Sequence, residues 1–224
     1  MAIEAIIFDW YGTLAAPSHE DFWNRMPEII QGAGGKLQGL TEWEANPLKH
    51  EAHSRSEDIY RAWQADRLST LFQRCGIAEP GRSKLVEELS SVRYQRQFDV
   101  FPEVPHALRR LRDRGFRLGV CSNWDWDLER HLHRNEIHYL FDVIACSASV
   151  GFRKPHPRIF ETVANRIGIL PQSMLFVGDS WSDDVEGAMG AGFQPVHIAR
   201  TGCPVADHLS ARCVRDLDGV ESLV

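Results

Sequence analysis

Four groups of reactive side chains stand at separate points of the chain, each beyond the end of an apolar run. They begin, in chain order, at Asp9, Ser122, Lys154 and Asp179. A carboxylate can attack phosphorus or carbon and form a covalent intermediate, and further carboxylates supply the oxygen ligands that Mg²⁺ prefers. A lysine neutralises the charge of a bound phosphoryl group, and a serine hydroxyl donates to its oxygens. Brought together, these groups could hydrolyse an ester through a covalent intermediate.

The pattern around these groups predicts alternating strands and helices. Continuous apolar runs predict strands over residues 3–8, 117–121, 143–146, 174–177 and 195–198. Helices are expected near residues 103–114, 128–135, 157–167 and 184–191. Such alternation is typical of an α/β fold, in which helices cover both faces of a parallel sheet. Ligands bind beyond the carboxyl ends of the strands in these sheets, which is where the four groups stand.

Residues 16–99 interrupt this alternation. They show helical spacing of apolar side chains, clearest over residues 56–75 and 84–98, and no convincing strand. We therefore expect an α/β catalytic core made of residues 1–15 and 100–224, with an all-helical domain of residues 16–99 inserted after the first strand.

Composition and charge restrict the classes of partner. The chain has 224 residues and a net charge of −6, and this acidic balance disfavours nucleic acid or an anionic membrane surface as the main partner. No apolar stretch approaches the length of a membrane-spanning helix, and the first residues lack the basic leader and cleavage site of a signal peptide. We expect a cytoplasmic protein that acts on a small molecule and whose five scattered cysteines are reduced.

The motifs in chain order resemble those of a known family. The chain reads D-x-x-G-T-L from Asp9, S-N at Ser122, K-P at Lys154 and G-D-S-x-x-x-D from Gly178. This order is similar to the four motifs of the haloacid dehalogenase superfamily, and the helical insertion resembles the C1-type cap of its subfamily I. The resemblance covers nearly the whole chain, and it implies a hydrolase with a Rossmann-like core and a cap domain.

The resemblance implies a role for each matching residue. Asp9 would be the nucleophile, Lys154 would pair with it and with the transferred group, and Ser122 would complete the catalytic set. The residues that it implies in substrate binding are Tyr11, Gly12, Thr13, Ser122, Asn123 and Lys154.

The resemblance also implies a Mg²⁺ ion as cofactor. Its ligands would be Asp9, the backbone carbonyl of Tyr11, Asp179 and Asp184. Asp184 fits the second acidic position of the fourth motif better than Asp183, because of its register to the small residues that follow. Asp183 is the alternative at this position.

One position departs from the pattern of the superfamily's phosphatases. Most of them carry an aspartate two residues after the nucleophile, which protonates the leaving alcohol and then activates water. This chain has Tyr11 there, and a tyrosine with its ordinary pKa of about 10 is poorly suited to acid–base work at neutral pH. The form D-x-Y-G-T-L is also found in 2-haloacid dehalogenases, in which the halide leaves carbon without needing a proton.

Other positions favour a phosphatase. The dehalogenases carry Ser/Asn-type residues in the fourth motif and need no metal, whereas this chain keeps Asp179, Asp183 and Asp184. They also place a tyrosine six residues after the lysine, where this chain has Phe160, and an arginine for the halide in a region that corresponds to residues 41–53, which has none.

We therefore expect a Mg²⁺-dependent phosphatase that acts on a small phosphorylated metabolite through an aspartyl-phosphate intermediate, as a monomer or homodimer. The alternative is a metal-independent 2-haloacid dehalogenase. A third possibility is a catalytically weak member that binds a phosphorylated ligand or a protein partner.

Several aromatic and histidine residues have open roles. Trp124, Trp126 and Trp181 follow the second and fourth motifs, and core packing is the default expectation for them, with the lining of a substrate pocket as the alternative. The histidine pairs are expected at the surface rather than in metal sites; they are His131 with His133 and His50 with His53.

Overall fold

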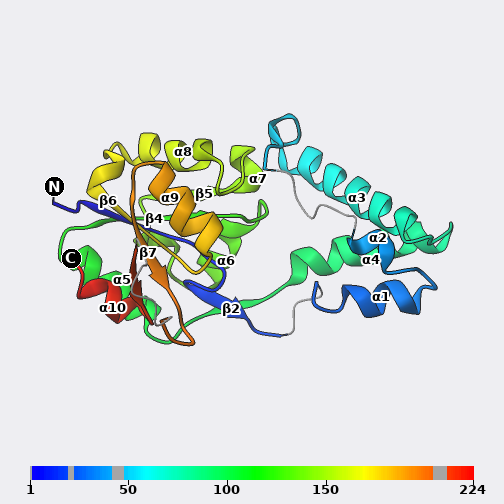
Figure 1. Ribbon diagram of the computed structural model, residues 1–224, viewed down its shortest axis with the longest axis horizontal. Helices are drawn as coiled ribbons and strands as arrows, with labels where there is room; N and C mark the ends of the chain where they lie inside the picture. Colours follow the sequence, from blue (N-terminus) through cyan, green and yellow to red (C-terminus); the bar gives the residue numbers. More distant parts are fainter. Residues whose placement is uncertain (1, 20–22, 42–47, 204–210) are drawn as a thin grey trace. The chain divides into compact units, whose positions relative to one another are not determined.

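The structure, a computed structural model, describes residues 2–19, 23–41, 48–203 and 211–224 (Figure 1). Part of the region 41–53, in which the halide-binding arginine was sought, lies outside the described residues. The chain divides into two compact units. The first comprises Met1–Ala16, Leu48–Glu51 and Asp99–Val224, and the second comprises Pro17–Pro47 and Ala52–Phe98.

A six-stranded parallel sheet forms the centre of the first unit, in the order β5-β4-β1-β6-β7-β8. Its strands are β1 (Ala5–Phe8), β4 (Arg117–Ser122), β5 (Val143–Cys146), β6 (Met174–Gly178), β7 (Gln194–Ile198) and β8 (Arg212–Val214). The residues of β1 are all buried, because β4 and β6 pair with its two edges and helices cover the sheet. The predicted α/β fold with a parallel sheet is therefore confirmed, and β8 is a strand that the pattern did not predict.

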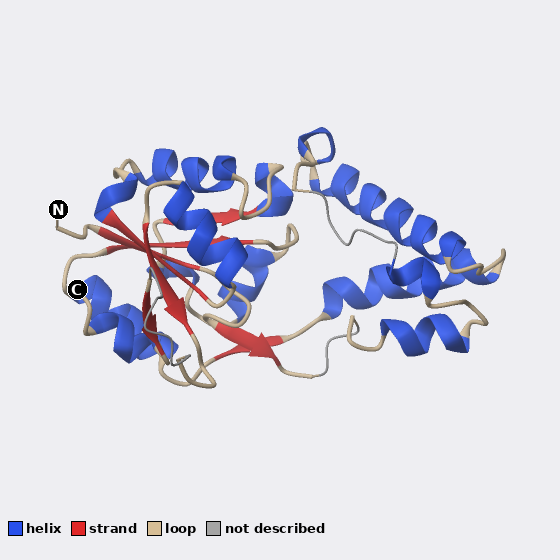
Figure 2. Ribbon diagram, in the orientation of Figure 1, coloured by secondary structure: helices blue, strands red, loops and turns tan. Residues whose placement is uncertain are grey.

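Helices cover both faces of this sheet (Figure 2). In Figure 1, α8 and α9 lie on one face, and α5 and α10 lie on the other. The helices of this unit are α5 (Val104–Asp113), α6 (Leu128–Arg134), α7 (Ser147–Val150), α8 (Pro157–Ile167), α9 (Gly187–Gly190) and α10 (Leu217–Glu221). The bounds of α8 follow from its sequence, since Pro157 suits a first helical position and Gly168 adopts the left-handed conformation that ends it.

The second unit is helical and has its own hydrophobic core. Its helices are α1 (Met26–Gly32), α2 (Gln38–Thr41), α3 (Glu57–Arg74) and α4 (Gly81–Gln95). Ile30, Leu71 and Phe72 are among the buried side chains that pack together there. Ser56 caps α3, because its hydroxyl accepts a hydrogen bond from the Ile59 amide.

Two short strands mark the ends of the insertion. β2 (Ala15–Pro17) pairs with β3 (Phe98–Val100) in a separate two-stranded sheet. The expectation of helix up to residue 98 was therefore wrong at its end: α4 stops at Gln95, and Phe98 is a buried strand residue.

Leu48–Glu51 belongs to the first unit although it lies in the middle of the insertion, and we call it the return segment. The His50 amide donates to the Gly151 carbonyl at 2.8 Å, and the Arg153 amide donates to the Leu48 carbonyl at 2.9 Å. The His50 side chain is buried, and its Nε2 donates to the Ser147 carbonyl at 3.0 Å. The surface position expected for His50 is therefore wrong, because the return segment pairs with the chain that precedes Lys154.

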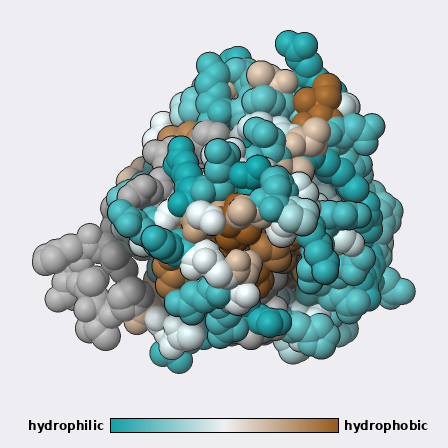
Figure 3. All heavy atoms as spheres, turned by 90° about the vertical axis from the view of Figure 1, so that its right-hand side faces the viewer, coloured by the Kyte–Doolittle hydropathy of each residue, from teal (hydrophilic) through white to brown (hydrophobic). Residues whose placement is uncertain are grey.

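The surface on the side of α1–α4 is largely hydrophilic, with an apolar area near the middle of that view (Figure 3). Among the described residues, no helix combines the length and the apolar character needed to cross a membrane.

Candidate active site

The carboxyl ends of three neighbouring strands bring chemically active residues to one edge of the sheet. Asp9 follows β1, Ser122 ends β4, and Asp179 follows β6. Lys154 reaches the same edge from the loop between α7 and α8. The structure therefore brings all four groups together around Asp9.

Lys154 lies between two buried carboxylates. Its Nζ donates to Asp9 Oδ1 at 2.6 Å and to Asp184 Oδ1 at 2.5 Å. The three residues are only 2%, 6% and 1% exposed, respectively. Burial alone would lower the pKa of Lys154, but the negative charges of Asp184 and Asp9 hold it above its ordinary value. Lys154 is therefore a fixed positive charge at the centre of the site.

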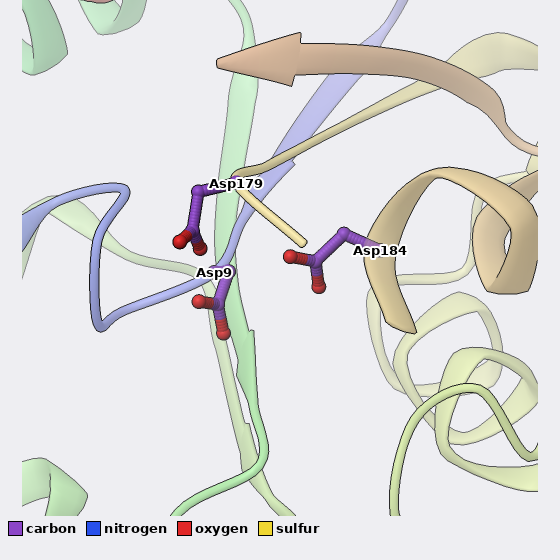
Figure 4. A group of neighbouring side chains, drawn as sticks. All are labelled: Asp9, Asp179 and Asp184. Atoms are coloured by element: carbon purple, nitrogen blue, oxygen red, sulfur yellow. The ribbon is translucent and has the colours of Figure 1, made fainter. Parts of the chain in front are cut away.

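Asp9, Asp179 and Asp184 form a cluster of carboxylates, each of which can offer an oxygen within 4.8 Å of the others' oxygens. Figure 4 shows the three side chains converging from separate segments of the chain. Burial, and next the charge of Asp9, raise the pKa of Asp179 to about 6. Burial is also the largest cause that raises the pKa of Asp184 to about 7. Because bringing three negative charges together is unfavourable, this oxygen-rich set suits a hard divalent cation.

Two glycines allow the carboxylates to approach the backbone closely. Gly12 has φ +80°, and a Cβ there would overlap the Asp179 carboxylate. A Cβ at Gly178 would overlap the Asp184 carboxylate in the same way. Any larger residue at either position would therefore displace an acidic side chain of the cluster.

The two consecutive aspartates of the fourth motif have different surroundings. Asp184 joins the cluster, and its Oδ2 accepts from the Ser180 amide at 3.0 Å. Asp183 instead accepts from the Asn123 side chain at 3.1 Å. Both lie in a π-helical turn, Trp181–Glu186, where a regular helix was expected from residue 184. Such turns are frequent at functional sites because they redirect side chains.

Asn123 supports the backbone of Lys154. Its Oδ1 accepts from the Lys154 amide at 2.7 Å, and its Nδ2 donates to the Lys154 carbonyl at 3.0 Å. These bonds fix the peptide units from which the lysine side chain extends. The sequence resemblance implied a different role, contact with the phosphoryl group.

The remaining residues expected in substrate binding differ in exposure. Ser122 is buried at the end of β4. Thr13 is fully buried, and its hydroxyl has no hydrogen-bond partner among the described residues. Tyr11 is 41% exposed, and its ring stacks on Trp124 with 6.3 Å between ring centroids.

His197 is a site neighbour that the sequence did not indicate. Its Nε2 donates to the Asp179 carbonyl at 3.1 Å from β7. No motif marks this histidine, and only its place at the end of the expected strand 195–198 could have drawn attention to it.

The expectation that all cysteines are reduced was wrong. Cys203 and Cys213 form a disulfide with 5.9 Å between their Cα atoms, whereas Cys75, Cys121 and Cys146 are buried and free. The pair forms because β8, which was not predicted, places Cys213 beside β7 and within reach of Cys203.

A family model described as "haloacid dehalogenase-like hydrolase" matches residues 3–192. The chain belongs to this family of hydrolases. The resemblance inferred from the four motifs is thus confirmed at the level of the family, as is the expectation of a hydrolase.

Relatives of the hydrolase include both phosphatases and dehalogenases. Glyceraldehyde 3-phosphate phosphatase of Methanothermobacter thermautotrophicus is 38% identical over 102 residues, which is 44% of this chain and 44% of that protein. The hydrolase thus matches less than half of the length of that relative. Haloacetate dehalogenase H-2 of Moraxella sp. is 30% identical over 89% of this chain and 87% of that protein. The crystal structure of a HAD phosphatase from Thermococcus onnurineus, 22% identical, has the same fold, with a TM-score of 0.64 over 99% of this chain and 97% of that one.

Proposed function

We propose that this hydrolase is a Mg²⁺-dependent phosphatase that acts on a small phosphorylated metabolite. The observation that carries the proposal is the cluster of Asp9, Asp179 and Asp184, whose oxygens lie within 4.8 Å of one another. Displacement of halide from carbon needs one carboxylate nucleophile and no further acids, so it gives no reason for the other two. A phosphoryl group brings negative charge into the site, which a cation and Lys154 would balance.

The carboxylates of Asp9, Asp179 and Asp184, with the backbone carbonyl of Tyr11, would hold the Mg²⁺ ion. When bound, the ion supplies positive charge to the phosphoryl oxygens and screens the nucleophile from them.

Individual residues of the chain would carry out separate parts of the reaction. An Asp9 oxygen forms a bond to phosphorus while the bond from phosphorus to the ester oxygen breaks and that oxygen leaves with the electron pair. Water then hydrolyses the aspartyl phosphate, which releases inorganic phosphate and regenerates the Asp9 carboxylate. Lys154, fixed between Asp9 and Asp184, balances the charge of the transferred group. Ser122 donates its hydroxyl to a phosphoryl oxygen. By its resemblance to the family's C1-type cap, the helical second unit would be the cap domain of this hydrolase.

The alternative, a 2-haloacid dehalogenase, is favoured by Tyr11 and by the similarity to haloacetate dehalogenase H-2 over most of both chains. Nucleophilic attack by Asp9 on carbon would release halide, and the ester formed would be hydrolysed. This reaction gives no role to the carboxylates of Asp179 and Asp184, which lie beside Asp9.

The two activities are separated by their products and by their need for metal. Purified protein is incubated with a panel of phosphate esters and with short 2-haloacids, each with Mg²⁺ and with EDTA. We expect phosphate release that stops in EDTA and is abolished by Asp9→Asn. Halide release that persists in EDTA, without phosphate release, would show the dehalogenase instead.

A further inference from the structure

Tyr11 presents an aromatic ring beside the nucleophile. It stands two residues after Asp9 and is 41% exposed, whereas its neighbour Trp10 is fully buried. One side of the ring is covered by Trp124, with 6.3 Å between ring centroids and 26° between the planes. Asp9 and Trp124 follow β1 and β4, which are paired neighbours in the sheet. The exposed part of the ring is thus held at the edge of the sheet where Asp9 lies.

Trp124 is itself held in place by buried polar groups. Its Nε1 donates to Asp127 Oδ1 at 3.1 Å, and the other Asp127 oxygen accepts from His131 Nε2 at 3.3 Å. His131 also packs edge-on against Trp124, with 5.7 Å between centroids. All three side chains are buried, which contradicts the surface position expected for His131. Because Trp124 is buried, the Tyr11 ring is the aromatic surface open to a ligand, and the hydrogen-bonded Trp124 supports it from one side.

The same position determines which leaving groups can depart. A carboxylic acid at residue 11 would give a proton to the leaving oxygen, and a phenol is a weaker acid by about six pKa units. An aliphatic alcohol, with a pKa near that of water at about 16, leaves poorly as an alkoxide without such help. A phenol, with a pKa of about 10, leaves far more readily as its anion. Tyr11 therefore disfavours alkyl esters and tolerates aryl esters.

We propose that the substrates are phosphate esters of aromatic hydroxyl groups, whose ring stacks on the exposed ring of Tyr11. The inference rests on the proposed phosphatase function and names its substrate class. Two separate features of Tyr11 lead to this inference. Its weakly acidic hydroxyl favours aryl leaving groups, and its exposed ring, supported by Trp124, offers a surface on which an aromatic leaving group can stack.

The reaction balances without a proton donor from the protein. An Asp9 oxygen forms a bond to phosphorus while the bond from phosphorus to the aryl oxygen breaks, and the electron pair leaves with the aryl oxide. This anion takes a proton from solvent. Water then attacks phosphorus of the aspartyl phosphate, which releases inorganic phosphate, regenerates the Asp9 carboxylate and returns one proton to solvent.

The test is the dependence of kcat/KM on the leaving group, measured by phosphate release in Mg²⁺. The probes are phenyl phosphates with different ring substituents, together with ethyl and benzyl phosphate. Benzyl phosphate has an aromatic ring but an aliphatic oxygen, so it separates stacking from leaving-group chemistry. We expect alkyl oxygens to be slower than phenyl phosphate by about 10² to 10⁴, the factor that a general acid supplies. KM should be lower for benzyl than for ethyl phosphate.

Three variants of Tyr11 test separately the contributions of its ring and of its hydroxyl group to these differences in kcat/KM and KM. Tyr11→Phe keeps the ring and should keep the preference for aryl over alkyl esters. Tyr11→Leu should raise KM for phenyl phosphate about fivefold, the contribution of one aromatic pair, and leave KM for ethyl phosphate unchanged. Tyr11→Asp should raise kcat/KM for ethyl phosphate much more than for phenyl phosphate, because it supplies the missing acid.

The possible results distinguish the proposed preference for aryl esters from the phosphatase activity on which it rests. Equal kcat/KM for ethyl and phenyl phosphate in the wild-type protein overturns the inference and leaves the phosphatase standing. A loss of kcat/KM in Tyr11→Phe that is confined to ethyl phosphate also overturns it, because the hydroxyl would then be the proton donor. No phosphate release from any ester in Mg²⁺ overturns the phosphatase and the inference together.

Discussion

Lys154 forms ion pairs with both Asp9 and Asp184, and its removal tests how the site stabilises these two carboxylates. Lys154→Met leaves Asp9 and Asp184 buried without their shared partner. We expect the free energy of unfolding to fall by about 3 kcal/mol at neutral pH, since a buried charge that loses its partner is strongly destabilising. Urea denaturation measures the change, with Lys84→Met at an exposed position as the matched control. A loss no larger than that of the control would mean that the carboxylates do not depend on Lys154.

The carboxylate cluster makes binding of Mg²⁺ depend on pH. Asp179 and Asp184 have raised pKa values of about 6 and about 7, so without metal their contribution to stability is greatest at low pH and is lost as the pH rises through those values. A metal ion must displace these protons. We therefore expect Mg²⁺ to bind on the order of a thousandfold more weakly at pH 5 than at pH 8.

The Mg²⁺-induced rise in Tm, measured from pH 5 to pH 8, reports this coupling directly. The rise should shrink steadily as the pH falls, and Asp179→Asn should reduce it at pH 8. A rise in Tm that does not vary with pH would show that the ion does not bind at these carboxylates.

At the scale of elements, the return segment supports the chain that carries Lys154. His50→Ala removes the donor to the buried Ser147 carbonyl. The Ser147 carbonyl keeps its hydrogen bond from the Gly151 amide, so the loss of the His50 bond should cost only about 1 kcal/mol of stability. It should also reduce kcat, because the loop before Lys154 loses a support. His50→Gln, which keeps an N–H donor, should recover part of both.

Thermal unfolding and phosphate release measure these two effects, and His106→Ala at an exposed position serves as the control. If kcat falls equally in His50→Ala and His106→Ala, the return segment has no part in positioning Lys154.

An element could be predicted where the signal for it lies within its own sequence, and was missed where it depends on pairing with distant residues. The central strands are continuous apolar runs, and α8 has both end signals, so residues 157–167 were predicted with the observed bounds. The place of Asp184 in the cluster agrees with the register of its motif. The return segment and β8 had no such signal, since they are short and are defined by pairing with distant residues. The disulfide and the burial of His50 were missed for the same reason.

At the scale of the whole molecule, the two units have separate hydrophobic cores. Phe72 lies in the core of the second unit and Phe160 in that of the first, and both are fully buried. Substitution of either by alanine should cost about 3–5 kcal/mol. We expect Phe72→Ala to accelerate amide hydrogen exchange mainly in α3 and α4, and Phe160→Ala mainly in α8 and β6, because each change weakens one core.

Hydrogen exchange followed by mass spectrometry resolves the two patterns peptide by peptide. Equal acceleration in both units by either substitution would show that they unfold as one cooperative body.

The return segment also affects which part of the insertion can be exchanged for that of a relative. The chain passes between the units four times rather than twice, because Leu48–Glu51 lies with the first unit between two stretches of the second. A chimera that grafts a relative's insertion between β2 and β3 would also replace the return segment, which is hydrogen-bonded to Gly151 and Arg153. A graft that retains Leu48–Glu51 from the host should preserve catalysis better than a complete swap. The part of the insertion that can be exchanged between relatives therefore excludes the return segment, although this segment lies within the insertion in the sequence.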